Sequence, residues 1–339
     1  MFFLRKIFTN RLDVSLFVVY LLGISKLTTN KLQKKHDLFR VQLPIPTEKS
    51  AIDYFVEVRF GTQPYSVRCG SVKVSRKNGN SQSRFFHCND CNTEFSIFRD
   101  TIFYNSQTDL RKWFFAINTM LLVKKGISAL QLQREIGCTY KTVWRMLNLI
   151  RKAMGNEKDR QLFEAIVEID ETSVGEKPRK KNIHAENKLL KRGRGTSKTP
   201  IIGVKSRTTK GVYARVTLPN KEGKKLSGKQ LLPILLECCK PNTTAMTDEF
   251  RSYGILDRKD SQFQRLSINH KECYAIGDIH TNGIEGFWSL FKRGFYGTYH
   301  KMSVKHMQNY LNEFCFKQNN LYNNDDVFEL LVRQCIAAA

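Results

Sequence analysis

The sequence predicts an α/β chain in which a large domain follows two smaller modules. Between residues 107 and 154 the apolar side chains repeat with helical spacing. From residue 162 onward they instead favour three short strands, a helix and a further strand. Three consecutive strands followed by a helix and a strand are the opening of a ribonuclease-H-like α/β fold. We therefore expect that fold for residues 162–320.

Composition supports a globular protein with a polyanionic partner. The 339 residues suffice for two or three domains, and 41% hydrophobic residues exclude a disordered chain. The formal net charge is +25, and residues 176–229 hold 17 Lys or Arg against three acids. Such a surplus favours nucleic acid, with a merely soluble basic surface or a ribosome-like protein as the alternative. Nine scattered cysteines do not form the framework of a secreted, disulfide-rich protein.

The first 44 residues predict a leader that does not span a membrane. The apolar run Leu16–Ile24 has nine residues, which is too short to cross a bilayer. Basic residues before it imitate a signal peptide, but no convincing cleavage site follows. We expect either a buried helix or an unstructured segment.

Residues 45–105 predict a short helix over 47–60 and then a degenerate zinc ribbon. A ribbon needs two CxxC knuckles, because four thiolates complete a tetrahedral shell. Cys88 and Cys91 form the second knuckle, but Cys69 has Ser66 three residues before it. Cys69, Cys88 and Cys91 are thus candidate zinc ligands. A ribbon-shaped fold that has lost its metal is the alternative.

Residues 106–156 predict a helix-turn-helix DNA-binding module. After a helix over 109–122, Ser128 can cap a second helix, Gly137 can close it, and Thr139 can cap a third. An ordinary three-helix bundle would show the same pattern. If the module binds DNA, the contacts come from the exposed start of the last helix, namely Tyr140, Lys141, Thr142 and Arg145.

Two aspartates are predicted to close strands of the large domain. Residues 163–170, 199–204, 211–218 and 243–247 have strand patterns, and residues 228–239 have a helical one. Asp170 ends the first strand and Asp248 follows the fourth. An open α/β sheet places its site at the carboxyl ends of strands. Each aspartate could instead cap a local turn.

The stretch 280–292 predicts a helix that begins at Asn282 as the N-cap. Its apolar positions 284, 287, 288 and 291 form one buried stripe. Glu285 lies beside that stripe, and Lys292 lies two turns further along. Glu285 is either a capping-box acid at the third helical position or part of a site.

Together the three carboxylates predict a site for divalent cations. Asp170, Asp248 and Glu285 can hold two ions about 3.5–4 Å apart, which activate an attacking oxygen and stabilise a leaving one. Hard oxygen ligands favour Mg²⁺ or Mn²⁺.

Several motifs resemble the Merlin superfamily of DDE transposases and its bacterial insertion-sequence relatives that carry an N-terminal zinc ribbon. They cover roughly residues 45–320. The carrying segments are Val167-Glu168-Ile169-Asp170-Glu171-Thr172, Thr247-Asp248, the runs 280–289 and 292–300, Gly126-Ile127-Ser128, residues 140–146 and Phe95-Ser96.

The resemblance implies a ribonuclease-H-like domain behind a zinc ribbon and a helix-turn-helix. It implies cleavage of DNA at terminal inverted repeats and joining of the 3′ ends to target DNA. Asp170, Asp248 and Glu285 would be the metal ligands, and Lys292 and Arg293 would contact DNA. Some relatives use Asn as the third residue, so Asn282 is a competing assignment. Ser66 departs from the family pattern.

The sequence therefore predicts a Mg²⁺-dependent transposase that acts as a homodimer or higher oligomer on DNA. A catalytically inactive, domesticated DNA-binding regulator is the alternative. We expect the nucleus as its location in a eukaryote, and otherwise the cytoplasm or nucleoid. The expected units are 1–44 (leader), 45–105 (ribbon), 106–156 (helix-turn-helix), 162–320 (catalytic domain) and 321–339 (C-terminal helix).

Overall fold

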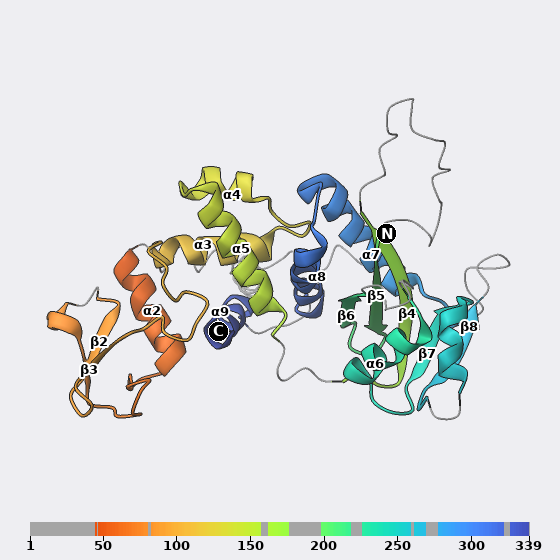
Figure 1. The fold of residues 1–339 in the computed structure, drawn as a ribbon, viewed down its shortest axis with the longest axis horizontal. Coiled ribbons are helices and arrows are strands. Elements are labelled where there is room, and N and C mark those ends of the chain that lie inside the picture. Colours follow the sequence, from red (N-terminus) through yellow and green to blue (C-terminus); the bar gives the residue numbers. More distant parts are fainter. Residues whose placement is uncertain are drawn as a thin grey trace, which may run out of the picture.

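The computed structural model describes residues 45, 47–80, 83–156, 162–175, 198–217, 226–258, 261–268, 277–321 and 326–338. Within these ranges two sheets lie at opposite ends of the molecule, with helices between them (Figure 1). The predicted leader 1–44 and most of the predicted basic insertion 177–198 lie outside the described residues. No helix in the described ranges is long and apolar enough to cross a bilayer.

The first unit begins with a capped helix and a small sheet. Helix α2 (Glu48–Phe60) confirms the predicted helix, and its capping box joins Thr47 and Ser50, each of which accepts the amide of the other at 3.1 Å. An antiparallel sheet follows in the order β1 (Val74–Arg76), β2 (Phe85–Cys88) and β3 (Thr93–Ser96), with a 3-10 turn at Lys77–Gly79.

Three helices complete this unit along the chain, and their predicted start and stop signals are confirmed. Ser128 accepts the Gln131 amide at 3.2 Å, and Thr139 accepts the Thr142 amide at 3.3 Å. Gly137 closes the middle helix in the left-handed conformation, with φ 62°, that glycine adopts without strain. The helices are α3 (Leu110–Leu122), α4 (Ala129–Ile136) and α5 (Tyr140–Met154).

The last described helix returns to this first unit. Helix α9 (Val327–Ala337) packs against α2, α3 and α5. Its side chains Phe328, Leu331 and Val332 are buried in the same core as those of α2 and α3. The two ends of the described chain therefore share one hydrophobic core.

The second unit is a five-stranded mixed sheet in the order β6-β5-β4-β7-β8. Strands β4, β5 and β6 are antiparallel neighbours, whereas β7 and β8 run parallel to β4. The four predicted strands and the helix α6 (Gly228–Cys238) are confirmed, and β8 is an additional strand. The strands are β4 (Ile166–Val174), β5 (Thr199–Ser206), β6 (Val212–Val216), β7 (Thr244–Asp248) and β8 (Gln264–Ile268).

One predicted strand end is wrong. Asp170 does not close β4, because the strand continues to Val174. Its pairing with β5 extends that far, since Val174 lies opposite Thr199. The antiparallel neighbour thus prolongs the strand beyond the point where β7 ends.

Helices cover both faces of this sheet. On one face, Val167 and Ile169 share a core with α6 and with the 3-10 helix Arg251–Asp257. On the other, Val174 and Ile201 pack with α7 (Asn282–Gly294). Because side chains alternate along a strand, Glu168 and Asp170 point to the α7 face.

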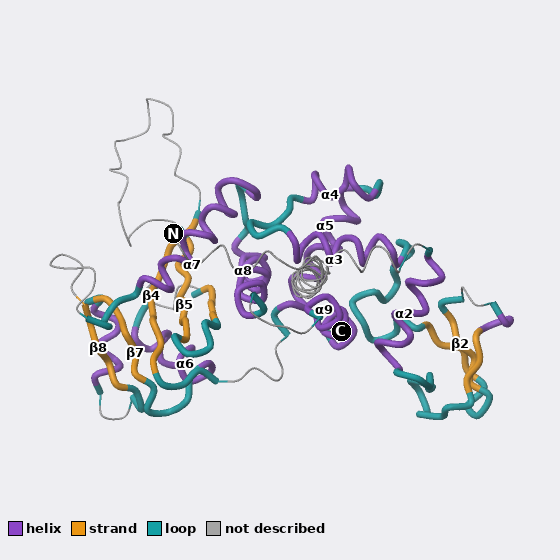
Figure 2. The backbone as a smooth tube through the Cα atoms, turned by 180° about the vertical axis from the view of Figure 1, so that it is seen from behind, coloured by secondary structure: helices purple, strands orange, loops and turns teal. Residues whose placement is uncertain are grey.

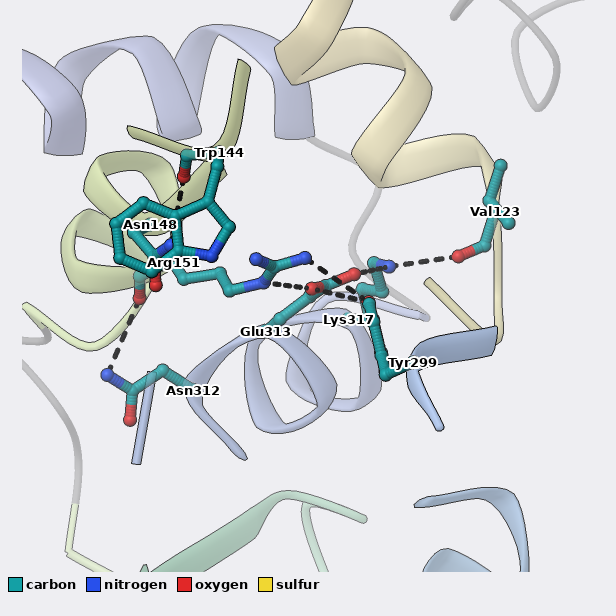
Figure 3. A network of polar contacts seen from close by, with 8 residues as sticks. All are labelled: Val123, Trp144, Asn148, Arg151, Tyr299, Asn312, Glu313 and Lys317. Atoms are coloured by element: carbon teal, nitrogen blue, oxygen red, sulfur yellow. Dashed lines mark hydrogen bonds and ion pairs between the residues drawn. The ribbon is translucent and has the colours of Figure 1, made fainter. Parts of the chain in front are cut away.

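Helix α8 joins the two units. A π-helical turn, Phe295–Tyr299, follows α7 and leads to α8 (Val304–Asn319). Figures 1 and 2 both show α8 between the larger sheet and the helices of the first unit. Arg151 of α5 pairs with Glu313 of α8 at 2.8 Å, and Lys317 and Tyr299 also contact that carboxylate (Figure 3).

Candidate active site

Asp170 and Asp248 lie on adjacent parallel strands at matching heights. The pairing of β4 with β7 places Val167 opposite Ala245 and Glu168 opposite Met246. Continuing this register by two residues brings Asp170 level with Asp248, the last residue of β7. The predicted position of Asp248 at a strand end is confirmed. Adjacent strands lie about 4.8 Å apart, so the two carboxylates meet at this edge of the sheet.

Glu285 enters from the first turn of α7, although the predicted cap is wrong. Thr281, not Asn282, is the N-cap, and Asn282 is the first helical residue. Glu285 is therefore the fourth helical residue and not the capping-box acid. Its Oε1 accepts a hydrogen bond from the Thr281 hydroxyl at 2.9 Å. Both Glu285 and Asn282 are exposed.

The neighbouring acids act electrostatically on Asp170. Burial, followed by the charges of Glu171, Asp248 and Glu285, raises the pKa of the Asp170 carboxyl from 3.8 to about 7. The Glu171 amide donates to Asp170 Oδ1 at 2.8 Å and partly opposes this shift. The fold thus brings together three acids from β4, β7 and α7, and the neighbouring charges make Asp170 harder to ionise.

Neighbouring side chains hold the two strand ends in place. The Tyr253 hydroxyl donates to Glu171 Oε2 at 2.7 Å. Asp248 Oδ1 accepts the Phe250 amide at 2.9 Å, which forms a turn directly after β7. Arg265 of β8 donates to the carbonyl of Asp248 at 3.1 Å.

Sequence reasoning missed the side chain that anchors α7. Glu168 is 3% exposed and accepts the amide of Ile284, in the first turn of α7, at 2.9 Å. Arg207 donates to the same carboxylate at 2.8 Å and also to the carbonyl of His280 at 2.8 Å. A carboxylate at a helix N-terminus satisfies a free amide and complements the helix dipole. Glu168 therefore ties the segment that carries Glu285 to the strand that carries Asp170.

Two glycines allow α7 to lie this close to the sheet. A Cβ at Gly283 would lie 2.6 Å from Glu168 Oε2. A Cβ at Gly203 of β5 would lie 2.4 Å from the ring of Trp288. The close approach thus requires glycine at both positions. The sequence does contain a signal for the anchor of α7. It is Glu168 itself, an acid two residues before Asp170 on the same face of an apolar strand.

The predicted DNA contacts lie elsewhere, in two groups. Tyr140, Lys141 and Arg145 are exposed on the first two turns of α5, while the Thr142 hydroxyl bonds that of Thr139 at 2.9 Å. Lys292 and Arg293 are exposed at the end of α7.

The small sheet brings the three predicted zinc ligands together. The sulfur atoms of Cys69, Cys88 and Cys91 all lie within 4.8 Å of one another. The buried Ser66 hydroxyl lies 3.8 Å from Cys91 Sγ. A hydrogen bond from Thr93, supported by the other three side chains, lowers the pKa of the Cys91 thiol to about 6. Three thiols and one hydroxyl thus stand at the four positions where two CxxC knuckles would have four thiols.

Relatives of the chain are mobile-element proteins. A model of the family described as ISXO2-like transposase domain matches residues 162–319. A protein of Halobacterium salinarum, described as an uncharacterized protein in transposable element ISH50, is 30% identical over 257 residues, which cover 74% of this chain and 85% of that protein. An uncharacterized transposase-like protein of Haemophilus influenzae is 35% identical over 105 residues, covering 31% of this chain and 79% of that protein.

Similarity to solved structures is weaker. A chain of the pre-cleavage Mos1 transpososome matches 90% of this chain and 97% of its own length at 13% identity, with a TM-score of 0.26. The identity to the Halobacterium protein across most of both chains and the match of the family model confirm the resemblance predicted from the motifs. The chain therefore belongs to the DDE transposase family, among the proteins with an ISXO2-like transposase domain.

Proposed function

We propose that this protein binds the terminal inverted repeats of a transposon, cleaves the DNA there and joins the 3′ ends to target DNA. In this proposal Asp170, Asp248 and Glu285 hold two Mg²⁺ or Mn²⁺ ions. One observation carries it: carboxylates from two register-matched parallel strands and one helix start lie close enough for Asp248 and Glu285 to raise the pKa of Asp170.

The donor set fits divalent cations. The carboxylate oxygens of three neighbouring acids are hard ligands, which Mg²⁺ and Mn²⁺ prefer. Asn282 is the weaker candidate for the third ligand, because Mg²⁺ is usually bound through carboxylates and the charge of Glu285 reaches Asp170.

The protein's own groups prepare the site. When bound, the ions supply activation of the attacking oxygen and stabilisation of the leaving oxygen. Asp170 releases its proton near neutral pH, Thr281 orients Glu285 through its hydroxyl, and Glu168 fixes the start of α7. The attack is first by water and then by the freed 3′-OH.

The strand order supports a ribonuclease-H-like domain for the second unit. Three antiparallel strands, a helix and two parallel strands, with helices on both faces, agree with the fold expected from the sequence. We propose this assignment together with the catalytic role.

The caps of α4 and α5 support a helix-turn-helix that reads the terminal repeats. A three-residue turn that contains Gly137 separates the two helices. Tyr140, Lys141, Thr142 and Arg145 would then contact DNA, as would Lys292 and Arg293.

We also propose a structural zinc ion at Cys69, Cys88 and Cys91. The lowered thiol pKa of Cys91 favours the thiolate that zinc requires. The protein would act as a homodimer or higher oligomer on paired ends, in the nucleus of a eukaryotic host and otherwise in the cytoplasm or nucleoid.

Cleavage of end-labelled duplexes that carry the inverted repeats flanking the gene tests the function. Wild-type protein should nick them only with Mg²⁺ or Mn²⁺. Asp248→Asn should lose at least about a thousandfold in rate, because a metal contributes several kcal/mol to the transition state. Glu249→Gln, the exposed neighbouring acid, is the matched control and should retain activity. Metal-dependent cleavage by Asp248→Asn at the wild-type rate would refute the assignment, and binding without cleavage by wild type would favour the inactive regulator.

A further inference from the structure

The exposed start of α5 lies against the start of α8. The ring of Trp144, in the second turn of α5, meets the ring of His306, in the first turn of α8, edge-on at 5.2 Å between centroids. Trp144 is nevertheless 37% exposed. The two helices are far apart in sequence, yet they present one continuous surface at this contact.

Charges of one sign surround this contact. Lys141 and Arg145 are exposed on either side of Trp144, and Lys305 is exposed directly before His306. We call these five side chains the junction surface. Neither residues 139–147 nor residues 286–306 contain an Asp or Glu. Glu313 is the first acid after them in α8, and it is fully buried in the Arg151 pair.

The buried side of the same two helices locks them together. The side chains of Arg151 and Glu313 are 2% and 0% exposed and pair at 2.8 Å. The Arg151 guanidinium also lies 4.2 Å from the centroid of the Tyr310 ring. Further along, a Cβ at Gly155 would lie 2.0 Å from the side-chain nitrogen of Asn312, so the helices are in close contact.

Such a buried pair holds one geometry. Removing either partner would leave an uncompensated buried charge, which is strongly destabilising. The α5–α8 arrangement is therefore formed before any ligand binds, and the junction surface does not need to be assembled by the ligand. A pre-organised surface binds with a smaller entropic cost.

We propose that the junction surface is one preassembled site for the phosphate backbone of duplex DNA, so that the recognition helix α5 binds DNA together with α8. The proposal rests on the proposed function only in taking DNA as the partner. Two lysines and an arginine, from two stretches of the chain that contain no acids, provide the charge complementarity for phosphates. Trp144 and His306 supply flat, partly polar rings between those cations.

Binding of the full-length protein to a fluorescein-labelled 30-base-pair duplex of arbitrary sequence tests this site. Anisotropy is measured over a salt series without Mg²⁺, so cleavage plays no part. Each lost phosphate contact lowers the slope of log K against log salt by about 0.9. Lys305→Ala should lower the slope by that amount, and Lys305→Ala with Lys141→Ala by about twice as much. Lys49→Ala removes the same charge from α2, away from α8 (Figure 1), and should leave the slope unchanged.

A slope and affinity for Lys305→Ala equal to those of the wild type would overturn the proposal. Unfolding does not obscure this result, because Lys305 is exposed and circular dichroism verifies the fold of each variant. If the slopes shift as expected while no variant or wild-type protein cleaves DNA, the junction surface stands and the proposed function falls. If cleavage occurs and Lys305 has no effect, the reverse holds.

Tryptophan fluorescence supplies an independent readout. Trp113 and Trp288 are 3% and 2% exposed, so DNA on the junction surface should change mainly the emission of Trp144. Trp144→Phe should abolish the DNA-induced change and keep the melting temperature. A full DNA-induced change in Trp144→Phe would contradict the site.

Discussion

The carboxylate site of the larger sheet and the cysteine cluster of the small sheet are both candidate metal sites, but they are built differently. The carboxylates come from β4, β7 and α7, which are far apart in sequence. The cysteines come from two short turns of one small sheet. The first set contains all its expected ligands, whereas the second has a hydroxyl in place of one thiol.

The supports of the two sites also differ. A buried partner, Glu168, positions the helix that carries Glu285. In the cysteine cluster, Ser66 itself holds its turn, since its hydroxyl accepts the amides of Arg68 and Cys69 at 3.3 and 3.4 Å. The turn therefore keeps its shape without the missing thiolate. A missing support should thus damage the carboxylate site more than a restored ligand changes the cysteine cluster.

Removing the support has the largest expected effect on stability. Glu168→Ala removes the carboxylate that pairs with Arg207 and the acceptor of the Ile284 amide. Breaking a buried ion pair on one side is strongly destabilising, so we expect a loss of about 3 kcal/mol in the free energy of unfolding. Urea denaturation measures it.

An ion pair at the surface, close to the start of β4, provides the control for that loss. Glu164 pairs with Lys240 at 2.5 Å, but the two side chains are 60% and 51% exposed. Glu164→Ala should cost less than about 0.5 kcal/mol. Equal losses for the two variants would show that Glu168 is not an anchor.

Restoring the fourth thiol has the next largest expected effect. Ser66→Cys completes a four-thiolate shell and should tighten zinc binding about thirtyfold, or by about 2 kcal/mol. Competition with a chromogenic chelator measures the affinity, and Ser71→Cys, in the neighbouring loop, is the control. An unchanged affinity in Ser66→Cys would mean that the Ser66 position does not face the metal.

The pH dependence of Mg²⁺ binding is the smallest of the three effects. The pKa of Asp170 is raised to about 7, so a proton competes with the ion below that pH. Because a raised carboxyl pKa disfavours the charged form, the metal-free protein loses stability as pH rises toward 7, and Mg²⁺ relieves this loss. Affinity should increase about tenfold from pH 6 to pH 8, which calorimetry measures. Equal wild-type affinities at both pH values would contradict the shifted pKa.

Local signals in the sequence predicted most of the elements. The caps at Thr47, Ser128, Gly137 and Thr139 act through neighbours within a few residues, so they are readable without the fold. Asp248 and Glu285 were likewise found from strand and helix patterns. In contrast, the strand β8 (Gln264–Ile268) has little apolar alternation to reveal it, since only Ile268 is buried.

Contacts between distant segments account for what was missed. The buried Glu168 has its partners at Arg207 and Ile284, which no local pattern connects. The same holds for the return of α9 to the first core and for the Arg151–Glu313 pair. The predicted N-cap of α7 was wrong by one residue. Glu168, rather than an N-cap side chain, satisfies the Ile284 amide, so the usual capping pattern does not apply.

Fe²⁺-directed backbone cleavage tests most directly whether the three carboxylates hold a cation together. Fe²⁺ in place of Mg²⁺ generates hydroxyl radicals at the ion, and mass spectrometry maps the cut sites. The account predicts cuts near Asp170, Asp248 and Glu285 in the wild type, and their joint loss in Asp248→Asn but not in Glu249→Gln. Cuts near Cys88 should be the same in all three proteins. Persistence of the cuts near Asp170 and Glu285 in Asp248→Asn would contradict a shared site.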